Sequence, residues 1–375
     1  MEKPKIRFKG YQEDWEQRKV GEVFEFQYGE FNNNPDNGGE YPIYGANGII
    51  GGYTDWNAEN SSIIGHMGAY AGYVVWGEGK HFVTYNGTIA RPKDNSIDSK
   101  YGYYLLDSKK IYKICAGSGQ PFVSYSDLNG IDILLPKDKD EQRLLAYYFT
   151  NLDHLITLHQ RKCEEMKTLK KYMLQKMFPQ NGQSVPQIRF SGFTEDWEQR
   201  KLGEVFKEYS EKNHTELPAL TIIQGGGTVK REESDRNLMY DESNLSNYKM
   251  VRKDDFIVHL RSFEGGLEKS LLDGIISPAY HTFHSDVADS RFYYPYFRSH
   301  EFIKHKLVPH VYGIRDGRSI DIAGMKTIEI PYTSIEEQRK IGDYLESLDH
   351  LITLHQQKCD ELRNIKKFML QNMFI

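Results

Sequence analysis

The chain has 375 residues, enough for two domains with sizeable hydrophobic cores. Its 48 basic and 53 acidic residues give a net charge of −5, which excludes nucleic-acid binding through bulk positive charge but not through a local basic stripe. Three cysteines, Cys115, Cys163 and Cys359, are too few for a disulfide framework. No signal peptide opens the chain, and no apolar run approaches the roughly 18 residues that span a bilayer. We therefore expect a cytoplasmic protein without a membrane segment.

Two stretches of the sequence occur twice. Residues 6–24 and 188–206 are identical at 15 of 19 positions, and residues 141–178 and 337–374 at 23 of 38 positions. The segments between them, about 27–140 and 207–336, share almost nothing. We call the repeated stretches the frame and the dissimilar segments the first and second cassette. The repeat predicts a pseudo-twofold molecule that presents one framework surface twice and two different recognition surfaces.

The second stretch of each frame predicts one long helix. Residues 141–178 contain no glycine, and their 38 residues would span roughly 57 Å at about 1.5 Å per residue. Apolar residues recur with a heptad period, so each helix has a stripe that needs a partner, and the other helix is the nearest one. We therefore predict an antiparallel coiled coil that acts as a spacer. Its expected seam includes Leu152, Leu155, His159, Leu348, Leu351 and His355.

The cassettes predict two α+β globular domains. Short strands joined by glycine- and asparagine-containing turns are expected in 41–56, 61–76 and 81–92, and again in 217–230, 254–262 and 274–284. Further strands at 130–136 and 325–331 end the cassettes, and helices are expected at 101–115 and 293–308. The predicted organisation is a first globular domain at 1–140, a spacer helix at 141–178, a linker at 179–187, a second globular domain at 188–336 and a second spacer helix at 337–375.

Motifs for catalysis and cofactor binding are missing from the sequence. There is no GxxxxGK[ST] phosphate loop and no Gly-x-Ser-x-Gly nucleophile elbow. His159 and Cys163, with His355 and Cys359, have the i, i+4 spacing of zinc ligands. An antiparallel pairing about the two histidines would, however, place Cys163 opposite Ile352. We therefore expect a polar layer that fixes the register of the helices, and no metal.

Polar and aromatic side chains on the predicted cassette loops favour contacts with nucleic acid. Gln, Asn and Arg can read base edges, whereas Lys, Ser and the backbone amides of glycine-rich loops suit phosphates. For each residue the alternative is an ordinary solvated loop. The candidates are Tyr44, Asn47, His66, Tyr70, Tyr85, Asn86, Ser118 and Gln120 in the first cassette, and Gln224, Lys230, Arg231, Arg261, Arg315 and Arg318 in the second.

Trp15 and Trp197 occur in identical EDWEQRK sequences of the frame. In one interpretation each indole docks the start of its half onto its own helix. In the other, the two tryptophans belong to a repeated surface that binds two copies of one partner. The two interpretations are compatible.

Four features of the sequence carry a resemblance to a known family: the order cassette–helix–cassette–helix, the doubled EDWEQRK(V/L)GEVF, LDHLITLHQRKCEEMKTLKKYMLQKMF with its copy, and YPIYGANGIIGGY. In these features the chain resembles the specificity subunit of type I restriction-modification enzymes. The resemblance covers essentially the whole chain. It implies that each cassette is a target recognition domain that reads one half of a bipartite, asymmetric site in double-stranded DNA, with the helices setting the gap. It also implies two modification subunits that carry S-adenosylmethionine for adenine methylation. Restriction subunits would add ATP- and Mg²⁺-dependent translocation and cleavage, and this chain would be non-catalytic and hold no cofactor.

Two alternatives from other functional classes stay open. A pseudo-symmetric coiled-coil scaffold would bind two proteins and no DNA; the net charge of −5 favours it slightly, and the base-reading side chains oppose it. A stand-alone nuclease or methyltransferase would need a metal or cofactor motif, and none is recognisable in the sequence.

Overall fold

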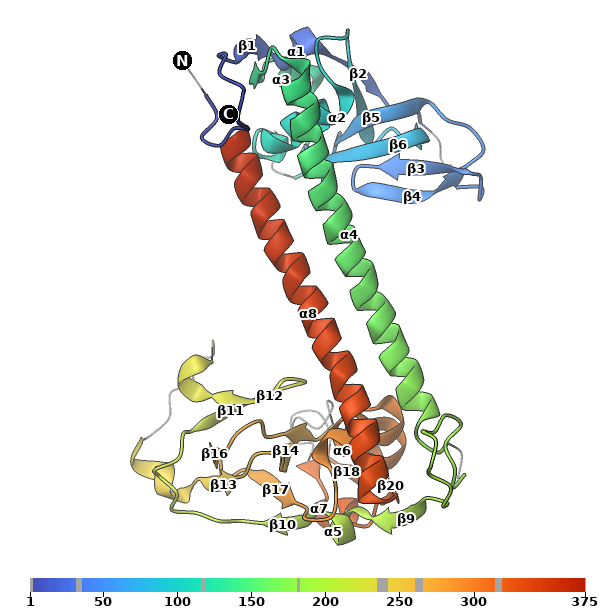
Figure 1. Cartoon of the computed structure of the whole chain (residues 1–375), viewed down its shortest axis with the longest axis vertical. Helices are drawn as coiled ribbons and strands as arrows, with labels where there is room; N and C mark the ends of the chain where they lie inside the picture. Colours follow the sequence, from blue (N-terminus) through green and yellow to red (C-terminus); the bar gives the residue numbers. More distant parts are fainter. Residues whose placement is uncertain are drawn as a thin grey trace. The chain divides into compact units, whose positions relative to one another are not determined.

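The computed structural model describes residues 3–31, 36–115, 119–180, 183–234, 242–259, 266–313 and 319–374. The chain forms two compact units. Unit 1 consists of Met1–Gln160 and Gln356–Ile375, and unit 2 of Arg161–His355. Each unit therefore contains one cassette, the beginning of the long helix that follows it and the end of the other long helix (Figure 1). No helix in the described ranges is long and apolar enough to cross a bilayer.

A six-stranded sheet in the order β2-β7-β5-β6-β3-β4 forms the body of the first cassette (Figure 1). Neighbouring strands are antiparallel except β3 and β6, which are parallel. The predicted strands are confirmed, although β6 is one long strand that bridges two predicted segments. The strands are β2 (Phe24–Tyr28), β3 (Tyr41–Gly45), β4 (Gly48–Tyr53), β5 (Ala58–Gly65), β6 (Val74–Val83) and β7 (Gly87–Pro92).

The helix expected at 101–115 is shorter than predicted. Helix α2 covers Ser99–Ser108, and a separate 3-10 turn, η1, covers Ile111–Lys113. The break lies at Lys110, whose backbone is left-handed with φ 50°, a conformation that cannot continue an α-helix. The other elements of this part are β1 (Glu16–Lys19), α1 (Val20–Val23), α3 (Tyr125–Asn129) and β8 (Asp132–Leu135).

In unit 2 the second cassette is built on smaller sheets. A four-stranded sheet has the order β10-β17-β14-β15, and β11–β12, β13–β16 and β18–β19 are separate pairs. The helix predicted at 293–308 is two elements, α6 (Ser290–Phe297) and the π-helical η5 (Phe302–Leu307). The strands are β9 (Glu198–Lys201), β10 (Lys207–Tyr209), β11 (Leu220–Ile223), β12 (Gly227–Lys230), β13 (Lys249–Val251), β14 (Phe256–His259), β15 (Glu268–Lys269), β16 (Gly274–Ile276), β17 (Tyr280–His284), β18 (Val311–Tyr312), β19 (Ser319–Ile320) and β20 (Glu329–Tyr332). The remaining helical elements are α5 (Leu202–Val205), η2 (Arg231–Glu233), η3 (Glu242–Asn247), η6 (Val308–His310) and α7 (Ile322–Met325).

The frame folds in the same way in both units. The repeated EQRK forms an edge strand that pairs with the last cassette strand, β1 with β8 and β9 with β20. The Arg7 guanidinium binds both carboxylate oxygens of buried Glu141 at 2.6 and 2.8 Å, and Arg189 binds Glu337 at 2.7 and 2.8 Å. These bidentate pairs join the start of each half to the first turn of its own long helix.

The tryptophans of the frame dock in the same places. Trp197 is buried, and its Nε1 donates to Glu337 Oε2 at 3.0 Å, which confirms the docking interpretation for the second half. Trp15 is also buried, in one core cluster with Leu145. Neither indole is exposed enough to form a partner surface by itself.

The two long helices are α4 (Lys139–Lys176) and α8 (Ile335–Met373), and they run antiparallel within each unit. In unit 1, Lys366 Nζ binds Asp153 at 2.7 Å, and in unit 2 the equivalent Lys170 binds Asp349 at 2.5 Å. Cys163 Sγ lies 3.8 Å from the carbonyl oxygen of Ile352, as the predicted register requires. His159 belongs to unit 1 and His355 to unit 2, so the polar layer between them stays a prediction.

The end of each long helix is buried in the unit of the other half. In unit 1 the Phe374 ring lies 5.6 Å from Phe149 and 5.5 Å from Tyr101 on α2. In unit 2 the equivalent Phe178 stacks on Phe292 of α6 at 4.8 Å. Backbone bonds repeat the pattern, from Ile6 N to Asn372 O and from Ile188 N to Lys176 O, both 2.9 Å. The C-terminal turn of α8 thus completes the first core.

The buried stripe of the helices differs from the predicted seam. Leu152 and Leu348 are buried as expected, but Leu155 and Leu351 are 40% and 39% exposed. In α4 the second buried row is Phe149, Ile156 and Cys163, which the sequence pattern places at the edge of the stripe. It lies one residue beyond the row expected in the seam, Tyr148, Leu155, Lys162, Leu169 and Lys176. The predicted row also contains Lys162 and Lys176, and burying their ammonium groups without partners would be costly.

Replacing Phe374 by alanine should destabilise unit 1 selectively. Loss of a buried phenylalanine typically costs about 3–5 kcal/mol, because the cavity remains partly open. We expect faster amide hydrogen exchange throughout unit 1 and unchanged exchange in unit 2, with the reverse for Phe178→Ala. Phe368→Ala, at an exposed position of the same helix, is the matched control and should leave both units unchanged. Equal loss of protection in both units after Phe374→Ala would contradict the assignment of the helix end to unit 1.

Candidate nucleic-acid interface

In the first cassette, loops that are far apart in sequence meet at one end of the six-stranded sheet. The β6–β7 turn touches the segment after β5, since His66 N donates to Asn86 O at 2.8 Å. That segment also pairs with residues 121–123, because Gly68 N donates to Pro121 O at 2.8 Å. The β3–β4 turn joins them: a Cβ atom at Gly65 would lie 3.1 Å from Ala46 O. We call the exposed side chains carried by these loops the first reading surface: Asn47, Tyr70, Tyr85, Asn86 and Gln120.

An aromatic stack fixes the loops beneath this surface. The rings of Tyr28 and Tyr125 are stacked at 4.1 Å, and His66 lies 4.3 Å from Tyr28. The Tyr28 amide donates to the Tyr125 hydroxyl at 2.6 Å, and His66 Nδ1 is 3.1 Å from the Val123 carbonyl oxygen. These contacts tie β2, α3 and the loop after β5 together, so the exposed side chains stand on a rigid base.

Two of the predicted contact residues are structural instead of exposed. Tyr44 was expected on a loop, but it lies in β3 with a side chain that packs against Ala58, Ile63 and Val83 and is 7% exposed. His66 follows β5 and is also buried. Both belong to the support of the first reading surface, because they are held inside the loops that carry it. Ser118 lies outside the described residues.

The second cassette brings fewer of its predicted residues together. Gln224 is exposed at the turn of the β11–β12 hairpin, whereas Lys230 pairs with Leu220 at the other end of the same hairpin. Arg231 lies 5.7 Å from the Tyr248 ring. Gln224 and the two basic residues therefore sit at opposite ends of a four-residue ladder. Arg261, Arg315 and Arg318 lie outside the described residues.

A buried carboxylate holds the turn that carries Gln224. Glu268 Oε1 accepts the Gly225 amide at 2.8 Å and the Arg298 guanidinium, and its Oε2 accepts the Tyr294 hydroxyl at 2.9 Å. Arg298 also lies 5.5 Å from the Tyr294 ring. The sequence did not indicate this cluster, since its members lie on a hairpin, a two-residue strand and the end of α6. The arrangement fixes the turn against α6 and can present Gln224 in one orientation.

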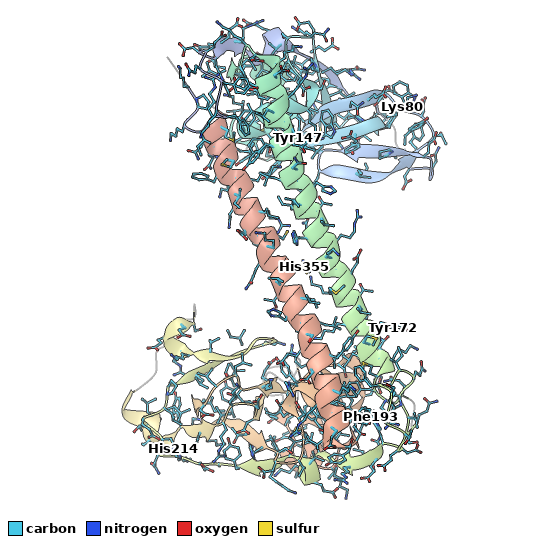
Figure 2. The ribbon with its side chains drawn as sticks, viewed as in Figure 1. Lys80, Tyr147, Tyr172, Phe193, His214 and His355 are labelled. Atoms are coloured by element: carbon cyan, nitrogen blue, oxygen red, sulfur yellow. The ribbon has the colours of Figure 1, made fainter. Side chains whose placement is uncertain are left out.

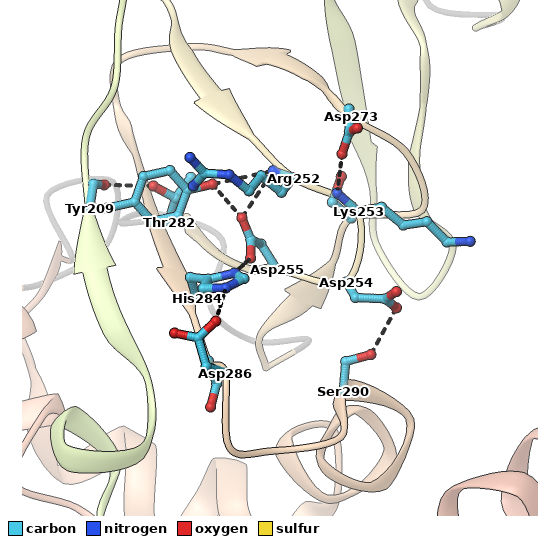
Figure 3. Close-up of polar contacts among 12 residues, drawn as sticks. Tyr209, Arg252, Lys253, Asp254, Asp255, Asp273, Thr282, His284, Asp286 and Ser290 are labelled. Atoms are coloured by element: carbon cyan, nitrogen blue, oxygen red, sulfur yellow. Dashed lines mark hydrogen bonds and ion pairs between the residues drawn. The ribbon is translucent and has the colours of Figure 1, made fainter. Parts of the chain in front are cut away.

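A second buried carboxylate lies immediately before β14 of the four-stranded sheet (Figure 3). Asp255 is 1% exposed and accepts hydrogen bonds from the Tyr209 hydroxyl and from the Arg252 amide at 2.9 Å. His284 Nδ1 lies 2.5 Å from Asp255 Oδ1, and its Nε2 lies 3.2 Å from Asp286. Burial alone would lower the pKa of His284, but hydrogen bonding and attraction to the two carboxylates outweigh it and raise the pKa. The cluster joins β10, the turn before β14 and β17.

Both long helices expose apolar side chains at equivalent positions of the repeat. Leu158 of α4 corresponds to Leu354 of α8, and Leu155 to Leu351, and all four are exposed. Tyr172, labelled on α4 in Figure 2, corresponds to Phe368. Tyr172 and Leu169 line a shallow groove along α4. The repeat therefore exposes the same kind of apolar side chain on both long helices. In the described parts of the chain no group of three His, Cys, Asp or Glu side chains is arranged to hold a metal ion.

Comparison with known proteins identifies the family. A model of the type I restriction modification DNA specificity domain matches residues 12–168 and again 194–364. The chain therefore belongs to this family, and the two matches follow the two halves of the repeat.

Relatives agree with this assignment. The chain is 26% identical over 330 residues to the type I restriction enzyme MjaVIII specificity subunit of Methanocaldococcus jannaschii, covering 82% of this chain and 77% of the relative. It is 26% identical over 203 residues to a putative type I specificity subunit of Mycoplasma pneumoniae, covering 52% of this chain and 53% of that one. The crystal structure of a type I restriction-modification S subunit from M. genitalium has the same fold, with a TM-score of 0.70, 17% identity and coverage of 100% and 99% of the two chains.

The His284 cluster should make the stability of unit 2 depend on pH. A histidine whose folded-state pKa is raised stabilises the folded state fully below its unfolded pKa, about 6.5, and loses this contribution as the pH rises through the folded-state value. We expect the free energy of unfolding of unit 2 to fall as the pH rises from about 6.5, and His284→Gln to remove most of this dependence. Urea unfolding across this pH range measures it. His214→Gln, at an exposed ion pair of the same unit, should retain the dependence, and a flat wild-type profile would refute it.

Proposed function

We propose that this chain is the DNA specificity subunit of a type I restriction-modification enzyme and that each unit reads one half of a bipartite, asymmetric site. The observation that supports the proposal is the convergence of four loops on the first reading surface, where Asn47, Asn86 and Gln120 are exposed together with Tyr70 and Tyr85. Amide side chains of this kind can read base edges. In the second unit the turn with Gln224 is the corresponding element. Two unlike cassettes on one repeated frame require two unlike half-sites.

The chemistry is assigned to partner subunits. The sequence has no phosphate loop and no Asn/Asp-Pro-Pro-Tyr/Phe methylase motif, so this chain is proposed to be non-catalytic and to hold no cofactor itself. S-adenosylmethionine would be bound by modification subunits that methylate adenine, and ATP and Mg²⁺ by restriction subunits. The complex would act in the cytoplasm. The role of the long helices as a ruler between half-sites stays a prediction.

The repeated helix surfaces are the proposed binding sites for two modification subunits. Leu155 and Leu158 form the first site and Leu351 and Leu354 the second, and all four side chains are exposed. A repeated surface binds two copies of one partner, because each copy finds the same side chains. The frame of the chain is thus the assembly surface and the cassettes are the reading surfaces.

Substitutions in the two cassettes should relax different half-sites. Asn86→Ala should remove about 1–3 kcal/mol of discrimination at a base pair of one half, and Gln224→Ala should do so in the other half. Single-molecule methylome sequencing of a methylation-free host that co-expresses the chain with its modification subunit reports both motifs. The unsubstituted chain should give one split motif with two unlike halves and a fixed gap. Relaxation of the same half by both variants would contradict the assignment of one half to each unit.

Charged substitutions on the helix surfaces should remove modification subunits one at a time. Leu155→Asp with Leu158→Asp should leave a complex with one modification subunit, and adding the equivalent Leu351→Asp and Leu354→Asp should leave none. Native mass spectrometry counts the subunits. Tyr147→Asp is the matched control, because Asp343 already occupies the equivalent position in the second half. Retention of both subunits by the fourfold variant would exclude these surfaces, and a full complex without DNA binding would support the scaffold alternative.

A further inference from the structure

Helix α2 connects the frame to a basic turn. Its first end is anchored on α4, where Gln142 Oε1 accepts the Asp98 amide at 2.8 Å and Asp98 caps the helix by accepting the Tyr101 amide at 2.9 Å. Its other end, about 15 Å away for ten residues, continues into Lys109-Lys110-Ile111-Tyr112-Lys113. We call residues 109–113 the basic turn. It was not among the contact residues predicted from the sequence.

The basic turn is a local positive patch in an acidic chain. Lys113 is exposed and Lys110 half-exposed, and neither side chain makes an ion pair with a described residue. The nearest acidic residue in sequence is Asp107 of α2. Burial, the largest effect, raises the pKa of Asp107, and its charge interacts with Lys366 and Asp153 of the frame. The charges of Lys110 and Lys113 are therefore available to a ligand.

The basic turn touches a loop of the first reading surface. Gly72 has φ +75°, and a Cβ atom there would lie 2.4 Å from the Tyr112 amide nitrogen, so the two backbones are in close contact. The rings of Tyr73 and Tyr112 are stacked at 5.0 Å with an angle of 19° between their planes. This contact places the lysines beside the loop that carries Tyr70.

Lys110 occupies a backbone conformation that does not favour lysine. Its φ and ψ are both 50°, the left-handed region, which glycine and asparagine adopt more readily. For lysine this conformation costs on the order of 1 kcal/mol. Glycine or asparagine would suit this backbone better, so the conformation does not account for a lysine here.

The second unit has the same arrangement. Gln338, the repeat equivalent of Gln142, accepts the amide of Asp289, which caps α6 as Asp98 caps α2. The residue that ends α6 is Arg298, and a Cβ atom at Gly225 would lie 2.9 Å from its Nη2 atom. In both units a helix anchored on the frame thus brings a basic residue against a glycine of a loop with predicted base contacts, although Arg298 is paired with Glu268. The second unit therefore repeats the anchoring of the helix on the frame.

We propose that the basic turn binds phosphates of the DNA backbone beside the first half-site, through Lys110 and Lys113. Lysine ammonium groups that neutralise phosphates position a protein on the duplex and add affinity without reading bases. The stacked tyrosines and the contact with Gly72 favour DNA over an acidic protein, since they join the patch to the reading loops. The inference rests on the proposed function, because it takes DNA as the ligand of the neighbouring surface.

The test uses the complex of the chain with its modification subunits and a duplex containing the methylated motif. Lys110→Asn and Lys113→Gln, singly and together, are measured by fluorescence anisotropy at several salt concentrations. Each substitution should weaken binding roughly tenfold near 0.1 M salt and lower the slope of log affinity against log salt by about 0.9. The methylated motif should stay the same, because phosphate contacts carry no base information.

The controls separate this role from a structural one. Asparagine suits the left-handed backbone, so Lys110→Asn should leave the thermal stability equal or higher while binding falls. Lys137→Gln changes an exposed lysine near the anchored end of α2 and should leave affinity and slope unchanged. Unchanged affinity and slope in the double variant would overturn the proposal, as would loss of modification subunits with a normal slope, which would indicate an acidic protein ligand. If the unsubstituted complex bound no specific DNA, the proposed function itself would fail.

Discussion

The structure depends on the burial of each long helix's last aromatic ring in the core of the other half. Phe374 closes the first core against Tyr101 and Phe149, and Phe178 closes the second against Phe292. Neither half of the sequence can complete its own unit, because one wall of each core comes from the other half. The backbone hydrogen bond from Ile6 N to Asn372 O joins residues close to the two ends of the sequence. Unit 1 is therefore completed only when the final turn of α8 is in place, a contact with a high loop-closure cost.

The burial of these rings also fixes the helices that lead to the loops. Gln142 and Gln338 lie one residue after the glutamates that bind Arg7 and Arg189, and they hold the first residues of α2 and α6. The helices pack against the buried phenylalanines on one side and reach glycine-containing loops at their other ends. The cassette sequences can diverge around this connection, which keeps the capping Asp98 or Asp289 and one aromatic contact in each unit. This explains how one frame supports two unlike reading surfaces.

Much of the fold could be predicted because the sequence contains periodic and repeated patterns. The repeat predicted two similar halves, and the heptad period predicted the antiparallel helices. The expected register of these helices predicted that Cys163 lies opposite Ile352. The exposure of Leu155 and Leu351 was not predicted, because a single sequence does not show which of two adjacent rows on a helix is buried against the partner helix. Lys162 in one of those rows was the available signal, since a lysine ammonium is rarely buried without a partner.

The candidate site was predictable only in part, because its geometry arises from contacts between distant residues. Asn47, Tyr85 and Asn86 sit in tight turns, where glycine and asparagine signal exposure. Tyr44 carries the same local signal but points into the core, since the strand register decides which face a side chain occupies. The partners of Glu268 are separated by 43, 26 and 30 residues, so no local pattern could have indicated them.

The distribution of charge resolves the apparent conflict between an acidic chain and a DNA ligand. Electrostatic attraction in salt acts over about 10 Å or less, so the charges near a bound phosphate matter more than the net charge of −5. Acidic residues of the frame are engaged internally, as Glu141 and Glu337 are with Arg7 and Arg189. The basic turn after α2 instead leaves lysines beside a reading loop. An acidic chain with local basic segments limits nonspecific attachment to DNA, because a duplex gains favourable contacts only where the loops can also read its bases.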